Sequence, residues 1–109
     1  MDTRSKILTL DEAGSVEATV LVIGYFDPVL ADHASRLASY GSPLVVSLLD
    51  PPEEMLPARA RAELVAALGC VRHVILGDAR GVVKAGNIVD ETGADLTARD
   101  TLIARILRG

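Results

Sequence analysis

The stretch that decides the fold is Val20-Leu-Val-Ile-Gly-Tyr-Phe-Asp-Pro-Val-Leu-Ala-Asp-His-Ala-Ser-Arg-Leu37. A β-branched apolar run over residues 17–24 predicts a strand that is covered on both faces, as in a parallel sheet. Gly24 allows the backbone to turn at the end of this strand, and the spacing of apolar residues over 30–39 predicts a helix after it. Such a junction presents backbone N–H groups and the positive end of a helix dipole at one point, so it predicts an anion site, usually for phosphate.

Two further strands and two further helices are predicted along the chain. The apolar runs 44–49 and 71–76 predict buried strands, and helical spacing predicts helices over 57–68 and 97–108. In the last helix, Thr97 is expected to be the N-cap. Its expected apolar face consists of Leu102, Ile103, Ile106 and Leu107. Strands that alternate with helices predict an α/β fold with a three-layer, doubly wound parallel sheet of the Rossmann-like, nucleotidyltransferase type, with four to five strands.

Two segments leave alternatives open. Residues 78–95 contain short apolar pairs that suit either a strand or a helical turn, and three glycines interrupt any long element. Near the N-terminus, residues 6–12 suit an extended piece followed by a helix start, with Thr9 or Asp11 as the cap.

The amino-acid composition and the length limit the classes of protein to which this chain can belong. Half of the 109 residues are hydrophobic but only 3% are aromatic, so Val, Leu, Ile and Ala must build the core. This length suits a single domain over residues 1–109. No apolar run approaches ~18 residues, and no apolar segment follows the first residues, so neither a transmembrane helix nor a secretory signal is expected.

Cysteine content and charge exclude further classes. Cys70 is the only cysteine, which excludes a disulfide framework and a cysteine-based zinc site and favours the cytoplasm. We expect its side chain to pack in the core. The formal net charge of −4 argues against nucleic-acid binding, which needs a basic surface.

The residues Gly24-Tyr-Phe26-Asp27-Pro-Val-Leu30-Ala-Asp32-His33 resemble the G-x-F-D-x-x-H-x-G-H signature of the cytidylyltransferase-like nucleotidyltransferases. The chain as a whole is similar to the adenylyltransferase domain of the ADP-heptose synthases. The other segments that carry this similarity are 6–12, 61–71, 88–93 and 101–106, of which the last two resemble a later helix and the closing helix of that domain.

The resemblance implies a reaction and a set of contacts. It implies ATP or CTP with Mg²⁺ as the cofactor of an active enzyme, and a phosphorylated sugar or alcohol as the substrate. Its nucleotide or anion contacts would be Gly24, Tyr25, Phe26, Asp27 and His33, with His33 as the catalytic residue and no protein ligand to a metal. We expect these side chains to line a pocket at the carboxyl edge of the sheet, where ligands of open α/β sheets bind.

This chain departs from the family pattern at three places. Leu30 stands where the first histidine is expected, and loss of one such donor typically lowers a rate by ~100-fold or more. Asp32 stands at the glycine, and a carboxylate ~4 Å from a phosphate charge costs roughly 4 kcal/mol at an effective dielectric of ~20. The family's lysine segment after the second strand is replaced by Asp50-Pro-Pro-Glu-Glu54.

Several of these side chains also have a structural interpretation. Asp32 suits the first turn of a helix, where a carboxylate is favoured by the dipole. Asp27 suits a turn or a cap, His73 lies within a predicted strand, and Lys84 is expected to be solvated. Arginines on helix surfaces generally meet water. That expectation applies to Arg59, Arg61, Arg99, Arg105 and Arg108.

Three functional hypotheses follow. The first is a degenerate, non-catalytic relative of the heptose-phosphate adenylyltransferases that binds a partner, a nucleotide or another small anionic ligand such as a sugar phosphate. The second is an active adenylyl- or cytidylyltransferase, and the third is a structural association module. A homo-oligomer, at least a dimer, is expected because so small a chain with 50% hydrophobic residues has apolar surface to spare.

Overall fold

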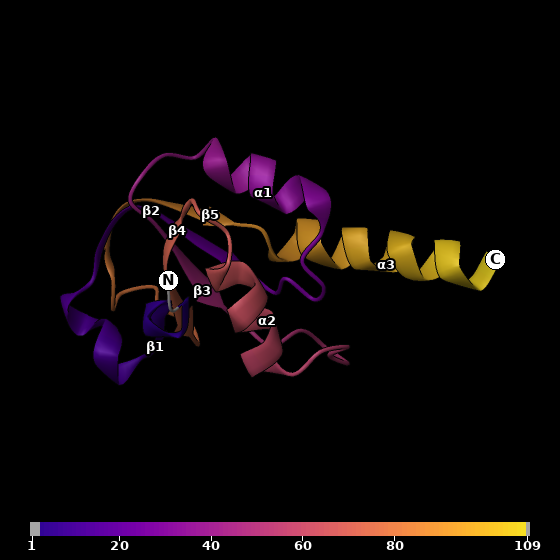
Figure 1. Ribbon diagram of the computed structural model, residues 1–109, viewed down its shortest axis with the longest axis horizontal. Helices are drawn as coiled ribbons and strands as arrows, with labels where there is room; N and C mark the ends of the chain where they lie inside the picture. Colours follow the sequence, from indigo (N-terminus) through magenta and orange to yellow (C-terminus); the bar gives the residue numbers. More distant parts are fainter. Residues whose placement is uncertain (1–2, 109) are drawn as a thin grey trace.

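The computed structural model describes residues 3–108, which form one five-stranded sheet with flanking helices (Figure 1). The elements in chain order are η1 Thr3–Lys6, β1 Ile7–Thr9, η2 Asp11–Ser15, β2 Glu17–Gly24, α1 Ala31–Ala38, β3 Leu44–Leu48, α2 Ala58–Ala66, β4 Val71–Leu76, β5 Lys84–Asp90 and α3 Thr92–Arg108. The predicted strands over 17–24, 44–49 and 71–76 and the predicted helices over 30–39 and 57–68 are therefore confirmed.

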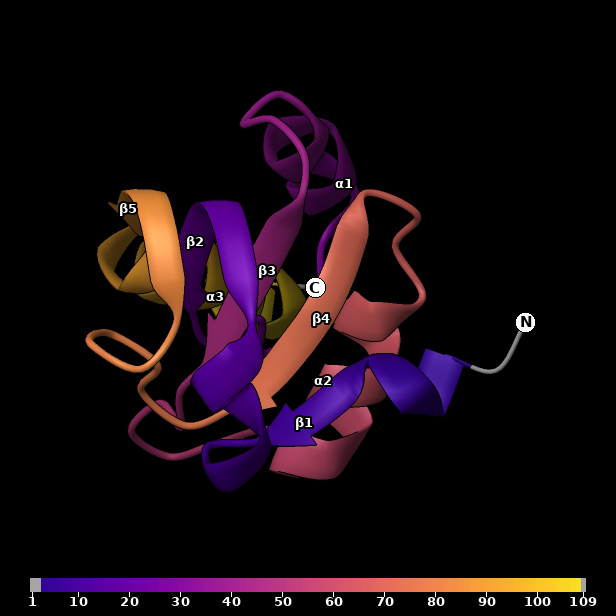
Figure 2. The same cartoon turned by 90° about the vertical axis from the view of Figure 1, so that its left-hand side faces the viewer.

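The strands pair in the order β1-β4-β3-β2-β5, and every pair is parallel (Figure 2). The central strand β3 is buried along its whole length, as its continuous apolar run predicts. The predicted Rossmann-like α/β class is confirmed, and the strand count is five.

The two faces of the sheet are covered differently. Helices α1 and α2 pack on one face, where Leu37 and Val65 meet Val22 and Val46 in the larger core. The other face has a thinner cover, made by η2 and by the connection 77–83 between β4 and β5. There the smaller core contains Ala13, Leu21, Val45, Ile75, Ala79 and Val83.

The segment left open by the sequence, 78–95, supplies the edge strand β5. Ile88 pairs with Leu21 and Val89 with Val22, so β5 satisfies the free edge of β2. The expected helical character of residues 88–93 is therefore wrong for the residues up to Asp90, because pairing with β2 outweighs local propensity.

The last helix differs from its prediction in two respects. It begins at Thr92, and Thr97 is not an N-cap, because its hydroxyl donates to the carbonyl oxygen of Gly93 at 3.1 Å within the helix. The expected apolar face is also not all buried: Ile106 is 64% and Leu107 is 80% exposed. Figure 1 shows the reason, which is that α3 runs out beyond the body of the domain.

The N-terminal prediction of an extended piece and a helix start is confirmed by β1 and η2. The cap is Leu10, not Thr9 or Asp11. Thr9 and Glu12 nevertheless bond reciprocally, with the Thr9 N–H donating to Glu12 Oε1 at 2.9 Å and the Glu12 N–H to Thr9 Oγ1 at 3.4 Å. The backbone and hydroxyl bonds from Thr9 lower the pKa of the Glu12 carboxyl.

Within residues 3–108, no helix combines the length and the apolarity needed to cross a membrane.

We expect Leu44→Ala to lower the free energy of unfolding by about 2–5 kcal/mol. Leu44 is 0% exposed, and the loss of its side chain leaves a cavity in the larger core beside β3. Leu64→Ala is the matched control, since Leu64 is 47% exposed on α2, and we expect it to cost less than about 1 kcal/mol. Urea unfolding followed by circular dichroism measures both. Equal losses in the two variants would contradict the burial pattern.

Candidate functional site

The turn after β2 is held by a carboxylate from the far end of the chain. Asp95, in the first turn of α3, accepts hydrogen bonds through Oδ2 from the backbone N–H of Tyr25 at 2.8 Å and of Phe26 at 3.3 Å. These bonds stabilise an unusual backbone, because Phe26 has φ +48°, in the left-handed region. The anion position predicted at the end of β2 is thus filled by the chain's own carboxylate.

Gly24 is required by the closeness of this contact. A Cβ atom at Gly24 would lie 2.6 Å from Cε2 of Phe26 and 2.7 Å from Oδ2 of Asp95, so the side chain of Phe26 or of Asp95 would have to move. Gly24, which the sequence predicts to allow a turn at the end of the strand, therefore also permits a close approach by Asp95.

His33 is the third group that binds Asp95. It is 2% exposed, its Nε2 lies 2.9 Å from Oδ1 of Asp95, and its Nδ1 accepts the backbone N–H of Leu30 at 2.7 Å. Because Nδ1 is an acceptor here, the ring hydrogen must be on Nε2, where it is donated to Asp95. We call Gly24, Tyr25, Phe26, His33 and Asp95 the strand-end site.

Asp27, the remaining predicted contact, binds backbone groups of the loop after β3. It is 4% exposed and accepts the backbone N–H groups of Met55 at 2.6 Å and Leu56 at 2.8 Å. Nη1 of Arg99 lies 3.9 Å from Oδ2 of Asp27 and donates to the carbonyl oxygen of Pro52 at 2.8 Å. Asp27 and Arg99 therefore fix the loop after β3, the place where the family's lysine segment is expected.

Arg61 does not meet water, contrary to the expectation for helix arginines. Its side chain is 0% exposed and lies between the sheet and the loop after β3. It donates to the carbonyl oxygens of Tyr25, Leu49 and Leu56, each at 2.9 Å, and to the carboxylates of Asp50 at 2.7 Å and Glu54 at 2.9 Å. Arg61 thus joins the ends of β2 and β3, and Arg99 also departs from the expectation through its contacts with the loop.

A third buried acid, Glu91, connects α1 to the start of α3. Nε of Arg36 lies 2.8 Å from Glu91 Oε2, and the phenol of Tyr40 donates to the same oxygen. Burial raises the pKa of Tyr40, and the hydrogen bond and charge of Glu91 raise it further. Burial alone would lower the pKa of Arg36, but the Glu91 and Asp32 carboxylates outweigh it, so this pKa is raised.

The charges at this edge of the sheet balance one another internally. Asp27 lies 3.9 Å from Arg99, Glu91 lies 2.8 Å from Arg36, and Asp95 lies 4.0 Å from Arg36. Three buried carboxylates are therefore paired with guanidinium groups that a phosphate-binding site would leave free. An incoming phosphate would have to compete for these cations.

The two positions that depart from the family signature lie on a groove. Leu30 and Asp32 line it from α1 and its approach, and α3 forms the other side through Ala98, Thr101, Leu102 and Arg105, with a volume of about 410 Å³. Asp32 is 71% exposed and in the first helical turn, as its structural interpretation predicts, and it lies 3.5 Å from Arg36. We name this the α1–α3 groove.

The expected pocket is not open in this conformation. Phe26, Asp27 and His33 are brought together with Gly24 and Tyr25, yet all except Tyr25 are buried. Their role in binding an anion stays a prediction.

A cavity of about 600 Å³ lies elsewhere, at the opposite edge of the sheet, with His73 among its lining residues. Cys70 is partly buried and packs against the larger core.

Sequence reasoning missed Asp95, Glu91 and the burial of Arg61. Asp95 carries one sequence signal, an acid at a helix start, but that signal depends on knowing that the helix begins at Thr92. Across residues 3–108, no group of three or more His, Cys, Asp or Glu side chains is placed to hold a metal ion.

Comparisons with known proteins add no relative. The chain matches no protein-family model, and a search of curated proteins found no match. The resemblance to the nucleotidyltransferases therefore stays a prediction.

We expect His33 to be in the Nε2–H form in solution, because Nδ1 accepts from Leu30. Long-range ¹H–¹⁵N correlation spectra distinguish the two ring nitrogens, and His73 serves as the internal comparison. In Asp95→Ala the hydrogen on Nε2 of His33 loses its acceptor. We expect this variant to have a lower free energy of unfolding, because each buried donor left without a partner costs about 1–3 kcal/mol. An Nδ1–H tautomer in the wild type would contradict the assigned geometry.

We expect Tyr40 to ionise above the ordinary tyrosine range near ~10, because its pKa is raised by burial and by Glu91. The folded state then holds the proton more tightly than the unfolded state. The stability contributed by Tyr40 is therefore complete below the unfolded pKa and is lost as pH rises through the folded pKa. Ultraviolet titration of the wild type measures this, with Tyr40→Phe removing the late step and Tyr25→Phe, the matched control, retaining it.

Proposed function

We propose that this chain is a degenerate, non-catalytic nucleotidyltransferase-like domain that acts by binding a partner. The observation that carries the proposal is the position of the Asp95 carboxylate. It accepts the hydrogen bonds of Tyr25 N–H, Phe26 N–H and His33 Nε2, and the family resemblance implies that these three residues contact a nucleotide or an anion. A carboxylate bound by its own chain is present at effectively high local concentration and competes with any dissolved anion.

The chemistry of the surrounding groups supports the same conclusion. Nucleotidyl transfer depends on donors and cations that are free to stabilise charge on the reacting phosphates. Leu30 offers no donor, the loop after β3 lacks the lysine segment, and Arg61 and Arg99 are committed to backbone carbonyls. A retained activity would require α3 to leave the strand-end site, which breaks the bonds of Asp95 and of Arg99 together.

Binding and turnover of nucleotides test the proposal. We expect titration calorimetry of the wild type with ATP–Mg and CTP–Mg to give negligible heat, and no pyrophosphate to form with a sugar phosphate present. We expect Asp32→Gly, alone or with Leu30→His, to leave binding negligible, because Asp32 is 71% exposed and does not fill the anion position. Low-micromolar binding by the wild type with release of pyrophosphate would overturn the proposal and establish an active transferase.

Asp95→Ala tests whether the Asp95 carboxylate, or the lack of free donors and cations around it, prevents nucleotide binding. If the variant folds by circular dichroism and then binds ATP–Mg or inorganic pyrophosphate, the carboxylate is the barrier. We expect at least tenfold tighter binding than in the wild type, since removing one charge repulsion of about 1.4 kcal/mol changes an equilibrium tenfold. Glu63→Ala, an exposed acid on the outer side of α2, is the matched control for a change in net charge.

A further inference from the structure

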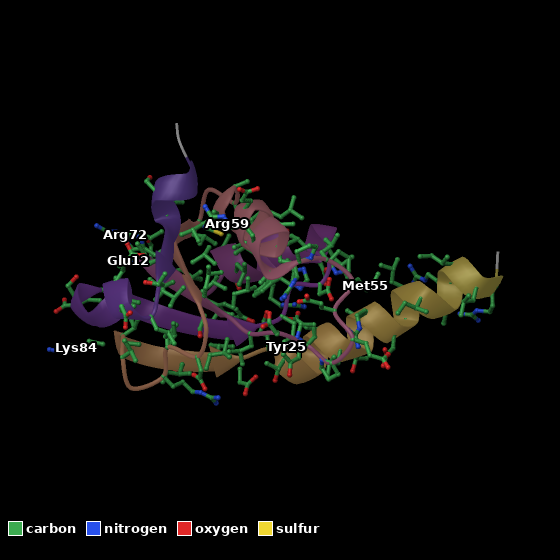
Figure 3. The ribbon with its side chains drawn as sticks, turned by 90° about the horizontal axis from the view of Figure 1, so that it is seen from below. Glu12, Tyr25, Met55, Arg59, Arg72 and Lys84 are labelled. Atoms are coloured by element: carbon green, nitrogen blue, oxygen red, sulfur yellow. The ribbon has the colours of Figure 1, made fainter. Side chains whose placement is uncertain are left out.

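The cavity of about 600 Å³ at the amino edge of the sheet is separate from the strand-end site. Its lining comes from η2 and from the chain where β2, β3 and β4 begin. Figure 3 shows Glu12 and Arg72, which both line it, at the end of the molecule away from Tyr25. Sites for small ligands usually have volumes of ~300–1,000 Å³, so this volume suits a small ligand. We call it the amino-edge cavity.

The charged side chains of this cavity have opposite signs and come from different elements. Arg72 lies at the start of β4, whereas Glu12 lies in η2 and Glu17 at the start of β2. Within residues 3–108, the side chains of Arg72 and Glu17 form no hydrogen bond and no ion pair. Lys6 lines an adjoining cavity, but its ammonium donates to the carbonyl oxygen of Ala66 at 3.0 Å. Of these two cations, Arg72 is therefore the one that is free to bind a ligand.

Glu12 and His73 each present one free polar atom. Oε1 of Glu12 accepts from the backbone and the hydroxyl of Thr9, and inside the described part of the chain Oε2 has no hydrogen bond. The bonds from Thr9 lower the pKa of Glu12, so this carboxylate is ionised at neutral pH. Nδ1 of His73 is buried without a partner, whereas Nε2 is not buried. Because buried donors need an acceptor, the ring hydrogen belongs on Nε2, where a ligand can accept it.

The cavity also has apolar walls and a definite width. Leu8 and Val16 line it and are partly buried against the smaller core, and Pro43 lines it just before β3. Strands β4 and β2 lie about 10 Å apart, because β3 separates them and neighbouring strands are about 4.8 Å apart. An extended peptide of two or three residues spans about 7–10 Å, so the distance between its ends suits this separation.

We propose that the amino-edge cavity binds a short peptide of two or three residues with both ends free. Arg72 and Nε2 of His73 bind the terminal carboxylate of the peptide, and Glu12 and Glu17 bind its terminal ammonium. An apolar side chain of the peptide packs on the apolar walls. The inference goes beyond the proposed function and stands without it, because this cavity shares no residue with the strand-end site.

Ligands with a single charge fit this cavity less well. Glu12 and Glu17 repel a simple anion such as phosphate or a nucleotide, and Arg72 repels a simple cation. A wholly apolar ligand would remove these charged groups from water without giving them partners, which is costly. A ligand that carries an ammonium and a carboxylate at opposite ends supplies partners for both sets of groups.

Titration with the tripeptide alanyl-leucyl-alanine, followed by ¹H–¹⁵N correlation spectra, tests the site. We expect saturable shifts of the amides of residues 12–17 and 72–73, with a dissociation constant in the range of about 1 mM or tighter. We expect acetylation of the amino end, or amidation of the carboxyl end, to raise that constant about tenfold or more, because each change removes one charged contact.

Two variants assign the ends of the peptide. In Arg72→Gln we expect the free and the amidated peptide to bind equally, and in Glu17→Gln the free and the acetylated peptide, because each variant already lacks the group that the blocked end would meet. Arg59→Gln and Glu63→Gln are the matched controls, since they make the same charge changes at exposed positions on α2. Both controls should distinguish the blocked peptides as the wild type does.

Three results would refute the peptide site. The first is the absence of saturable shifts at peptide concentrations up to about 20 mM. The second is equal binding of the free, acetylated and amidated peptides by the wild type. The third is a loss of discrimination in Arg59→Gln as large as that in Arg72→Gln, since the effect would then come from net charge and not from the cavity.

Discussion

The carboxylate of Asp95 joins three parts of the structure that are distant in sequence. It binds the turn after β2 through the N–H groups of Tyr25 and Phe26, it binds α1 through His33, and it belongs to α3. Because Asp95 is 6% exposed, its charge is acceptable only with these donors in place. The left-handed backbone at Phe26 and the absence of a side chain at Gly24 are consequences of the same contact.

The other buried polar groups at the carboxyl edge of the sheet also find their hydrogen-bond partners within the chain. Arg61 is fully buried and binds the carbonyl oxygens where β2 and β3 end, while Asp27 binds the N–H groups of the loop between β3 and α2. These groups would be unpaired without one another, and unpaired buried polar groups are costly. In most open α/β sheets this edge is where a ligand supplies the missing partners; here the chain supplies them itself.

Helix α3 combines two kinds of surface on one element. Its first half is held by the buried contact of Asp95 with His33 and by the hydrogen bond of Arg99 to the loop after β3, and its second half exposes Ile106 and Leu107. The contacts of the first half fix the direction in which the second half points, because both halves belong to one continuous helix.

The sequence by itself determined the parallel α/β class, the strands β2, β3 and β4, and the helices α1 and α2, because continuous apolar runs and helical spacing are local properties. It also placed Gly24, Phe26, Asp27 and His33 at one junction. Only the tertiary structure decided that Lys84–Asp90 is a strand, since a free edge on β2 overrides weak local preference. Likewise, the partners of His33 and Arg61 lie up to 62 and 36 residues away, and no local pattern specifies contacts of that range.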